Sequence, residues 1–301
     1  MAAGGFAVGV QVMGLIEDAP VPAVIAAAPE LDTPEAAEAW LNAMPIGDLA
    51  SVWCAAQRIS RRDQTGGAWY AILYFDRLPH NRPDRALDLA LEVLRSESDK
   101  LTVMQLNDKF MPSLIYANGD AVMDRIEREA KHNAKLRWLL GGVNFGPDEP
   151  FTQRIARISD AEAWEEDDIA RRTPVHPLEC ETMSVPELAR AWVEQYSKSD
   201  RDRDDNFFTM MDYERELREE DPDKAIDLIV EILKIETNPV LLSLLAAGPL
   251  EDVISMETID RIEREAARDK RFRDLLGGVW YYRAGDRLKA RLDAIIAGDR
   301  W

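Results

Sequence analysis

The chain repeats itself, and this internal duplication constrains its fold more than any other feature of the sequence. The run Asp-Arg-Ile-Glu-Arg-Glu-Ala occurs twice without a change, and so does the run Leu-Leu-Gly-Gly-Val. Both pairs share one sequence offset, 136, whereas the matches upstream of them share an offset of 139. Chance does not produce such agreement in one register, so we infer that an ancestral domain was duplicated. The matching segments, first copy before second, are 49–53 and 188–192, 83–84 and 222–223, 124–130 and 260–266, and 139–143 and 275–279.

Each copy is about 100 residues long, which is more than a helical-hairpin repeat needs and is typical of a small domain. The stretch between the copies contains several prolines and an acidic run, which is the composition of a linker. The expected organisation is an N-terminal extension at 1–45, a first, divergent copy at 46–145, a linker with a helical middle at 146–182, a second copy at 183–283 and a C-terminal amphipathic helix at 284–301.

Helical periodicity runs through almost the whole sequence and predicts an all-α fold. Apolar side chains recur three and four residues apart, with charged side chains on the opposite face. Alternating strand-like stretches joined by hairpin turns are missing from the sequence. The clearest apolar stripes are Ala86, Leu89, Ala90, Val93 and Leu94 in the first copy and Ala225, Leu228, Ile229, Ile232 and Leu233 in the second.

Start and stop signals agree with this prediction. Asp221 precedes Pro222, so a capping side chain stands before a proline at the first helical position. Capping boxes are expected at Ser184–Glu187 and at Ser159–Glu162. The Gly-Gly pairs at 141–142 and 277–278 follow apolar helical runs, and we expect these glycines to end the helices in the left-handed conformation.

The N-terminal extension is less regular than the two copies. Val21–Ala28 and Pro34–Ala43 have helical patterns, whereas Phe6–Ile16 is compatible with a strand, a docked helix or a frayed tail. The extension is therefore either an arm that binds a partner or a cover for the first copy.

Composition describes an acidic chain. The 37 Lys and Arg residues face 56 Asp and Glu residues, which gives a net charge of −19. Nucleic acid would repel such a chain, so we expect no nucleic-acid partner. The longest nearly apolar stretch, Phe6–Ile16, is too short to span a bilayer, and no Lys or Arg precedes Arg58. A cytoplasmic location without a membrane partner is therefore expected.

The acidity is unevenly divided along the chain. The net charge is −6 over residues 1–45, +1 over 46–145, −6 over 146–182 and −8 over 183–301. Ordinary solubility explains such a surface. The sharper alternative is a polarised molecule whose two copies bind partners of different charge or face each other. The candidate interaction residues in the linker are the acidic run Glu165, Glu166, Asp167 and Asp168.

Residues that match between the copies are candidates for function or for the core. Trp53 and Trp192 have apolar neighbours at helical spacing, which indicates core positions; the alternative is an aromatic anchor at an interface, for which Trp192 is the candidate. The repeated heptapeptide carries opposite charges three and four residues apart, such as Asp124 and Arg128. This pattern is typical of a solvated helix face with ion pairs within the helix.

Recognisable catalytic and metal-binding patterns are missing. His176 and Cys180 lie four residues apart, but a metal site would need two further ligands. The Gly-Gly pairs end helices rather than open them, so they do not form a phosphate-binding loop. The sequence contains no Gly-x-Ser-x-Gly motif. We therefore expect no catalytic residue, no cofactor and no metal.

The second copy resembles an uncharacterised bacterial helical domain of unknown function. The resemblance rests on an early Trp192, the helix start at 221–225, the turn Ala-Ala-Gly-Pro-Leu-Glu-Asp at 246–252, and Leu-Leu-Gly-Gly-Val-Trp at 275–280. The first copy departs from this pattern at the turn, and Asn144 replaces the final tryptophan. The resemblance implies a bacterial origin and a helical fold, and it supplies no activity, cofactor or catalytic residue.

The turn at 246–252 also has a physical explanation. Pro249 can begin a short helix, and Glu251 and Asp252 then lie in its first turn, where the helix dipole favours carboxylates. These two carboxylates are also candidate interaction residues.

Two functions of different classes follow from the sequence. The first is a non-enzymatic protein–protein interaction protein, with an immunity- or antitoxin-like version in which an acidic face masks a basic partner. The alternative is an enzyme with an unrecognised carboxylate-based site in the second copy, near Glu251, Asp252 and Glu263. The sequence favours the first, and it does not indicate an oligomeric state.

Overall fold

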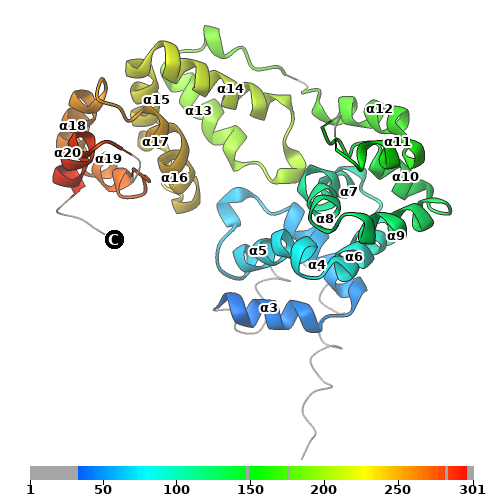
Figure 1. Cartoon of the computed structure of the whole chain (residues 1–301). Coiled ribbons are helices and arrows are strands. Elements are labelled where there is room, and N and C mark those ends of the chain that lie inside the picture. The colour runs from blue at the N-terminus through cyan, green and yellow to red at the C-terminus, as the bar shows by residue number, and fades with distance from the viewer. Residues whose placement is uncertain (1–32, 147–148, 175, 282–283, 297–301) are drawn as a thin grey trace, which may run out of the picture. The chain divides into compact units, whose positions relative to one another are not determined.

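A computed structural model describes residues 33–146, 149–174, 176–281 and 284–296. These residues form helices and no β-strand. The predicted all-α fold is therefore confirmed. The chain divides into two compact units, which are described separately (Figure 1). Unit 1 takes in the described residues up to Thr173 together with Ser199–Asp202, and unit 2 takes in Pro174–Lys198 and the described residues from Arg203 onwards.

Unit 1 contains the first copy, with α-helix 34–43 before it, two α-helices after it and the short helix at 200–202. Its helices are α3 (Pro34–Ala43), α4 (Ile46–Gln57), η1 (Arg61–Asp63), α5 (Gly66–Asn81), α6 (Pro83–Ser96), α7 (Lys100–Gln105), the π-turn η2 (Leu106–Phe110), α8 (Met111–Asn118), α9 (Asp120–Ala130), α10 (Ala134–Leu140), α11 (Thr152–Ile158), α12 (Ala161–Arg172) and the short η4 (Asp200–Asp202).

Unit 2 contains the remainder of the second copy. Its helices are η3 (Cys180–Thr182), α13 (Val185–Ser197), α14 (Asp205–Glu220), α15 (Pro222–Ile235), α16 (Pro239–Leu245), the π-turn η5 (Ala246–Leu250), α17 (Glu251–Val253), α18 (Ile259–Arg268), α19 (Lys270–Leu276) and α20 (Asp286–Ile296).

The helix bounds reproduce the duplication. Helices α4, α5 and α6 begin at positions 46, 66 and 83, and α13, α14 and α15 begin at positions 185, 205 and 222, which is the same offset of 139 each time. Both copies also interrupt the chain after the next helix with a π-turn, η2 in one and η5 in the other. Because the two π-turns have different sequences, we infer that tertiary packing maintains this irregularity.

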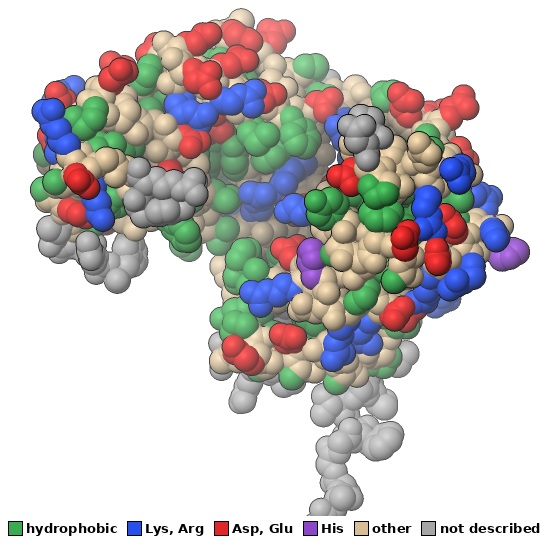
Figure 2. Space-filling model, in the orientation of Figure 1, with side chains coloured by type: hydrophobic (Ala, Val, Ile, Leu, Met, Phe, Trp, Pro, Cys, Tyr) green, Lys and Arg blue, Asp and Glu red, His purple; other side chains and the backbone are tan. Residues whose placement is uncertain are grey.

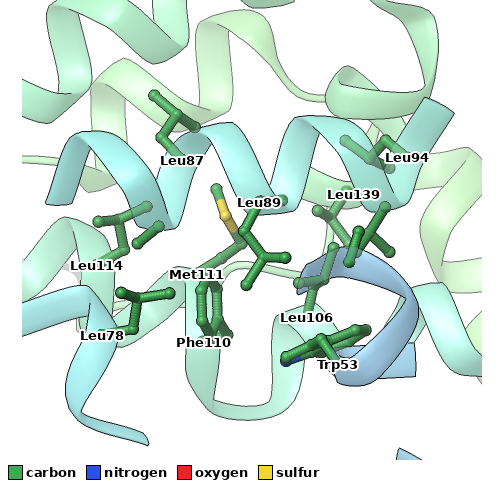
Figure 3. Close-up of a cluster of buried hydrophobic side chains, with 14 of the residues drawn as sticks. Trp53, Leu78, Leu87, Leu89, Leu94, Leu106, Phe110, Met111, Leu114 and Leu139 are labelled. Carbon is green, nitrogen blue, oxygen red and sulfur yellow. The ribbon is translucent and has the colours of Figure 1, made fainter. Parts of the chain in front are cut away.

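Each unit has a hydrophobic core of its own, and a tryptophan from the first helix of each copy lies in it. Trp53 is 2% exposed and Trp192 is 0% exposed. In unit 1 the ring of Phe110 packs edge-on against Trp53 with 6.3 Å between ring centroids, among leucines and methionines from α5, α6 and α8 (Figure 3). Both tryptophans therefore occupy core positions.

The repeated heptapeptide lies on α9 and α18, and its charges bind neighbouring helices. Arg154 of α11 donates to three carboxylates of α9: Asp120, Asp124 and Glu127, each at 2.6 Å. Arg291 of α20 does the same in unit 2, where it pairs with two carboxylates of α18. The expected solvated face with ion pairs inside the helix is therefore only part of the arrangement, because α9 and α18 each hold an arginine of a following helix.

The first arginine of the heptapeptide points the other way. Arg125 of α9 pairs with Asp84 and Asp88 of α6. Its counterpart in unit 2 repeats both contacts: Arg261 of α18 pairs with Asp223 and Asp227 of α15. One helix thus connects its predecessor and its successor through opposite charges, which explains why the heptapeptide recurs without a change.

These contacts also extend the repeat beyond the expected ends of the copies. Arg154 and Arg291 are related by an offset of 137, and the residues that follow them, Ile155 and Leu292, are both buried. Helix α11 falls in the segment expected as a linker, and α20 is the helix expected after the second copy. The two helices are therefore counterparts in the repeat.

Two local expectations are wrong. The glycines after α10 and α19 do not adopt the left-handed conformation, since Gly141 and Gly277 have φ of −59° and −64°. In unit 1 the reason for glycine is close packing: a Cβ on Gly142 would lie 2.1 Å from the Trp164 ring of α12. The capping box at Ser159–Glu162 is also displaced, because Asp160 caps α12 by accepting from the amide of Ala163.

Other local expectations are confirmed. The capping box at Ser184–Glu187 is present, and Asp221 caps α15 before Pro222. Pro34–Ala43 forms α3, which packs along α5 in unit 1 (Figure 1). The proposals for Phe6–Ile16 and Val21–Ala28 fall outside the described residues.

Candidate functional site

The acidic run at 165–168 lies on α12, and half of it is used inside unit 1. Asp167 accepts from Lys100 Nζ at 2.7 Å and from the indole of Trp138 at 2.9 Å. Asp168 pairs with the guanidinium groups of Arg171 and Arg172 in the following turn. Glu165 and Glu166 are exposed. Asp167 therefore holds α12 against α7 and α10, Asp168 pairs within α12, and the other two carboxylates remain on the surface.

Unit 2 contains a carboxyl group of a different kind, that of Glu214 on α14. Its Oε1 accepts from the indole of Trp192 at 2.5 Å, and its Oε2 accepts from the hydroxyl of Tyr196 at 2.5 Å. The two aromatic rings stack, with 4.2 Å between centroids and 15° between planes. Trp192 and Tyr196 lie one turn apart on α13, so a single helix face supplies both donors.

The surroundings of Glu214 change its acidity. Burial raises the pKa of its carboxyl group to about 7, although the hydrogen bonds from Tyr196 and Trp192 favour the ionised form. The guanidinium of Arg218, one turn further along α14, also favours ionisation, and the carboxylate of Asp252 opposes it. A carboxyl group with a pKa near neutral can donate or accept a proton at physiological pH.

Glu214 lies at a small pocket on unit 2. Arg218 stands at the same pocket and pairs with Asp252 of α17 at 2.5 Å. Most of the remaining lining is apolar and comes from α15. The lining residues are Glu214, Leu217, Arg218, Ala225, Leu228, Ile229, Ile232 and Pro249. The pocket thus combines an apolar floor with one titratable acid and one ion pair.

The first copy has an aromatic ring at the position of Glu214. At an offset of 139, Phe75 corresponds to Glu214, and Phe110 ends η2 as Leu250 ends η5. Both phenylalanines are buried, at 4% and 6% exposure, and Phe110 belongs to the cluster in Figure 3. The carboxyl group is therefore specific to the second copy, where an apolar side chain would satisfy the fold.

The other predicted carboxylates lie apart from this pocket. Glu251 accepts from the backbone amide of the exposed Trp280 at 3.1 Å, and Glu263 pairs with Arg291. Of the carboxylates expected near a site, only Asp252 approaches Glu214, through Arg218. Sequence reasoning missed Glu214 itself. The available signal was a glutamate in a helix at a position where the other copy has phenylalanine.

The exposed side of α14 is acidic and partly apolar. Phe208 and Met211 are each 41% exposed, and the side chain of Asp212, one turn after Phe208, is 53% exposed. Glu216, one turn beyond Asp212, is also exposed. Acidic side chains gather on the visible surface over this part of unit 2 (Figure 2). This face is the second candidate site.

No group of three or more His, Cys, Asp or Glu side chains in the described part of the chain is placed to hold a metal ion. Nor does any described helix have the length and apolar character that crossing a membrane requires.

Comparison with known proteins agrees with the duplication. A family model described as a family of unknown function, DUF6869, matches residues 57–163 and again residues 196–299. The two matched regions include α11 and α20, the counterparts at the end of each copy. No curated protein and no solved structure matches the chain. The chain belongs to the family of unknown function DUF6869, with two tandem copies of its domain.

Proposed function

We propose that this chain is a cytoplasmic bacterial protein that acts by binding a basic protein partner through its second copy. The observation that supports this proposal most directly is the outer face of α14, where the exposed Phe208 and Met211 lie among exposed carboxylates. Apolar contact area supplies affinity at an interface, and surrounding charges select the partner and steer its approach. An immunity- or antitoxin-like protein that masks a basic toxin is one version of this function.

The division of charge supports the same proposal. Residues 183–301 carry 19 bases and 27 acids, whereas residues 46–145 carry 14 bases and 13 acids. Two copies with one fold need the same core, so their surfaces are free to differ. An excess of acid in one copy alone suits a partner that one copy binds.

The test is affinity capture of the tagged full chain from a lysate of its source cells at low and high salt. A stoichiometric basic protein that is released by salt would agree with the proposal, because exposed charges are screened beyond about 10 Å at 0.1 M salt. The matched control is a chain in which two exposed acids of unit 1, Asp63 and Glu162, are changed to lysine, which should retain the partner. Failure of the unaltered chain to enrich any protein would refute the proposal.

A carboxylate-based enzyme is the second candidate function, and Glu214 favours it. A protonated Glu214 beside the Arg218–Asp252 ion pair has the acidity of a general acid at neutral pH. An activity that uses this pocket should depend on one ionisation near pH 7 and should be lost in the Glu214→Gln variant. A panel of hydrolase and lyase substrates tested with both proteins would decide; turnover that survives in the variant would exclude this site.

A further inference from the structure

The two copies differ in what covers the outer face of α5 in unit 1 and of its counterpart α14 in unit 2. In unit 1, α3 lies against α5, and the hydroxyl of Tyr74 on α5 donates to Asn42 of α3 at 3.0 Å. Arg85, at the start of α6, donates to the carbonyl oxygens of Leu41 and Met44 at 3.1 and 2.7 Å. These bonds satisfy the C-terminal end of α3, which has no intrahelical donors of its own.

The second copy keeps the residues that receive this helix. Tyr213 corresponds to Tyr74 and Lys224 corresponds to Arg85, both at an offset of 139. In unit 2 these two side chains contact each other instead, since Lys224 Nζ donates to the hydroxyl of Tyr213 at 3.0 Å. Unit 2 thus keeps the two side chains that bind α3 in unit 1, although it has no α-helix at the corresponding place.

The chain has no α-helix at this position. The stretch that corresponds to α3 is 173–182, of which only the short 3-10 helix η3 at its end is helical and packs on α14, and Pro177 falls at the place of Glu38, in the middle of α3. A proline there removes a helical hydrogen bond and its ring clashes with the preceding turn. In unit 2 the described residues 176–179 are accordingly not helical, and Asn206 at the start of α14 ties them down through Leu178 N and the carbonyl of His176.

The remainder of the α14 face is consequently open in the described structure. Thr209 and Asp212 correspond to Tyr70 and Leu73, which line the contact with α3 in unit 1. Both are exposed, whereas Tyr70 and Leu73 are partly covered. Glu216, also exposed, replaces Arg77. The face has thus kept a tyrosine and a cation at its receiving positions, and its charge at the place of Arg77 has changed from basic to acidic.

We propose that a basic amphipathic helix of the partner protein docks on this face of α14, in the place that α3 occupies on α5. The inference rests on the proposed function and names its surface. Charge decides the occupant. In unit 1 the acidic helix α3, with Glu35 and Glu38, lies beside the basic side chains of Arg77 and Arg82. The charge of the α14 face has the opposite sign, so this face suits a basic helix.

Charge also argues against occupants from this chain. Residues 1–45, which include α3, contain six acids and no base, so neither this stretch nor the α3 of a second copy complements Asp212 and Glu216. Lys224, at the end of the face, stands where Arg85 caps the last carbonyls of α3. A docked helix would place its C-terminus there, where the helix dipole favours a positive charge.

The probe is a labelled peptide of residues 33–44 in which Glu35 and Glu38 are replaced by lysine. Binding to the full chain is measured by fluorescence anisotropy and by amide chemical shifts. We expect shifts centred on α14 around Asp212 and Glu216, and affinity at least about tenfold weaker, a loss of ~1.4 kcal/mol, for the Asp212→Lys/Glu216→Lys variant. The unaltered acidic peptide should not bind.

A matched control is the Asp63→Lys/Glu162→Lys variant in unit 1, which has the same change in net charge and should bind the lysine peptide normally. The single Glu216→Lys variant, which leaves the Asp212–Arg215 ion pair intact, guards against loss of folding in the double variant. Absence of binding, shifts outside α14, or equal affinity for the double variant would overturn the proposed surface. If the captured partner still binds the double variant, the surface is wrong while the proposed function stands.

Discussion

The carboxyl group of Glu214 should make the stability of unit 2 depend on pH. Burial raises its pKa from the ordinary 4.5 to about 7, so the folded chain holds the proton more tightly than the unfolded chain does. The stabilisation is complete below pH 4.5 and is lost as the pH rises through 7. At ~1.4 kcal/mol per unit of pKa, the rise in the pKa of Glu214 from 4.5 to about 7 corresponds to roughly 3 kcal/mol in the free energy of unfolding.

The perturbation is Glu214→Gln, which keeps the shape and removes the titration. The amide oxygen can still accept from Trp192, and the amide nitrogen can donate to the hydroxyl of Tyr196. Urea unfolding of the full chain, followed by tryptophan fluorescence from about pH 5 to about pH 8, measures the effect. The variant should lose the pH dependence, and above pH 7 it should be more stable than the unaltered chain.

The control is Glu216→Gln, a change two residues along the same helix at an exposed position. This variant should keep the pH dependence of the unaltered chain, because its carboxyl group is solvated in both states. The reasoning fails if Glu214→Gln unfolds with the same pH dependence as the unaltered chain, or if the two variants behave alike. Either result would mean that Glu214 is ionised in the folded chain at low cost.

Three further experiments test the packing within the units. Arg154→Ala should destabilise unit 1 by about 1 kcal/mol at low salt and by less at high salt, because its three carboxylate partners are partly exposed to solvent. Arg157→Ala on the same helix is the control. Equal urea midpoints for the two variants would contradict the ion-pair explanation. Gly142→Ala should cost about 3 kcal/mol, because the new Cβ would meet the Trp164 ring at 2.1 Å. Gly278→Ala should cost less, because the nearest atom to its new Cβ is the Cβ of Ala246 at 3.0 Å. Thermal unfolding of both variants gives the comparison, and equal losses of stability would refute it. Cys54 and Cys180 are buried, and burial raises the pKa of both thiols, that of Cys54 to about 12. A thiol reagent should therefore modify both cysteines in urea and leave the native chain unreacted over the same time.

The fold could be predicted because its signals are local. Helical periods, the proline at the first position of α15 and the capping box at Ser184–Glu187 each concern residues within a turn or two of one another. The duplication adds an independent check, since the helices shared by the two copies are each predicted twice. Predictions of this kind depend on backbone geometry, which neighbouring residues largely determine.

The site could not be predicted in the same way, because its contacts cross long stretches of sequence. Trp192 and Glu214 are 22 residues apart, and Arg218 reaches Asp252 across 34. For the same reason the contacts of the repeated heptapeptide could not be predicted, because its partner Arg154 lies in a segment with the composition of a linker. A glutamate in a helix also has a ready local explanation as a solvated side chain, so nothing nearby distinguishes Glu214 from Glu216.

Comparison of the two copies shows where the chain departed from what the fold alone requires. Phe75 is an apolar core residue in one copy, while Glu214 occupies the same position in the other at a cost in desolvation. Pro177 removes a helix that the first copy uses to cover α5. We expect both differences to make unit 2 less stable than a faithful copy of unit 1 would be. A second copy that retains its core but gives up a covering helix and partly buries an acid agrees with the proposed binding function, since a partner can restore the stability that the copy lacks alone.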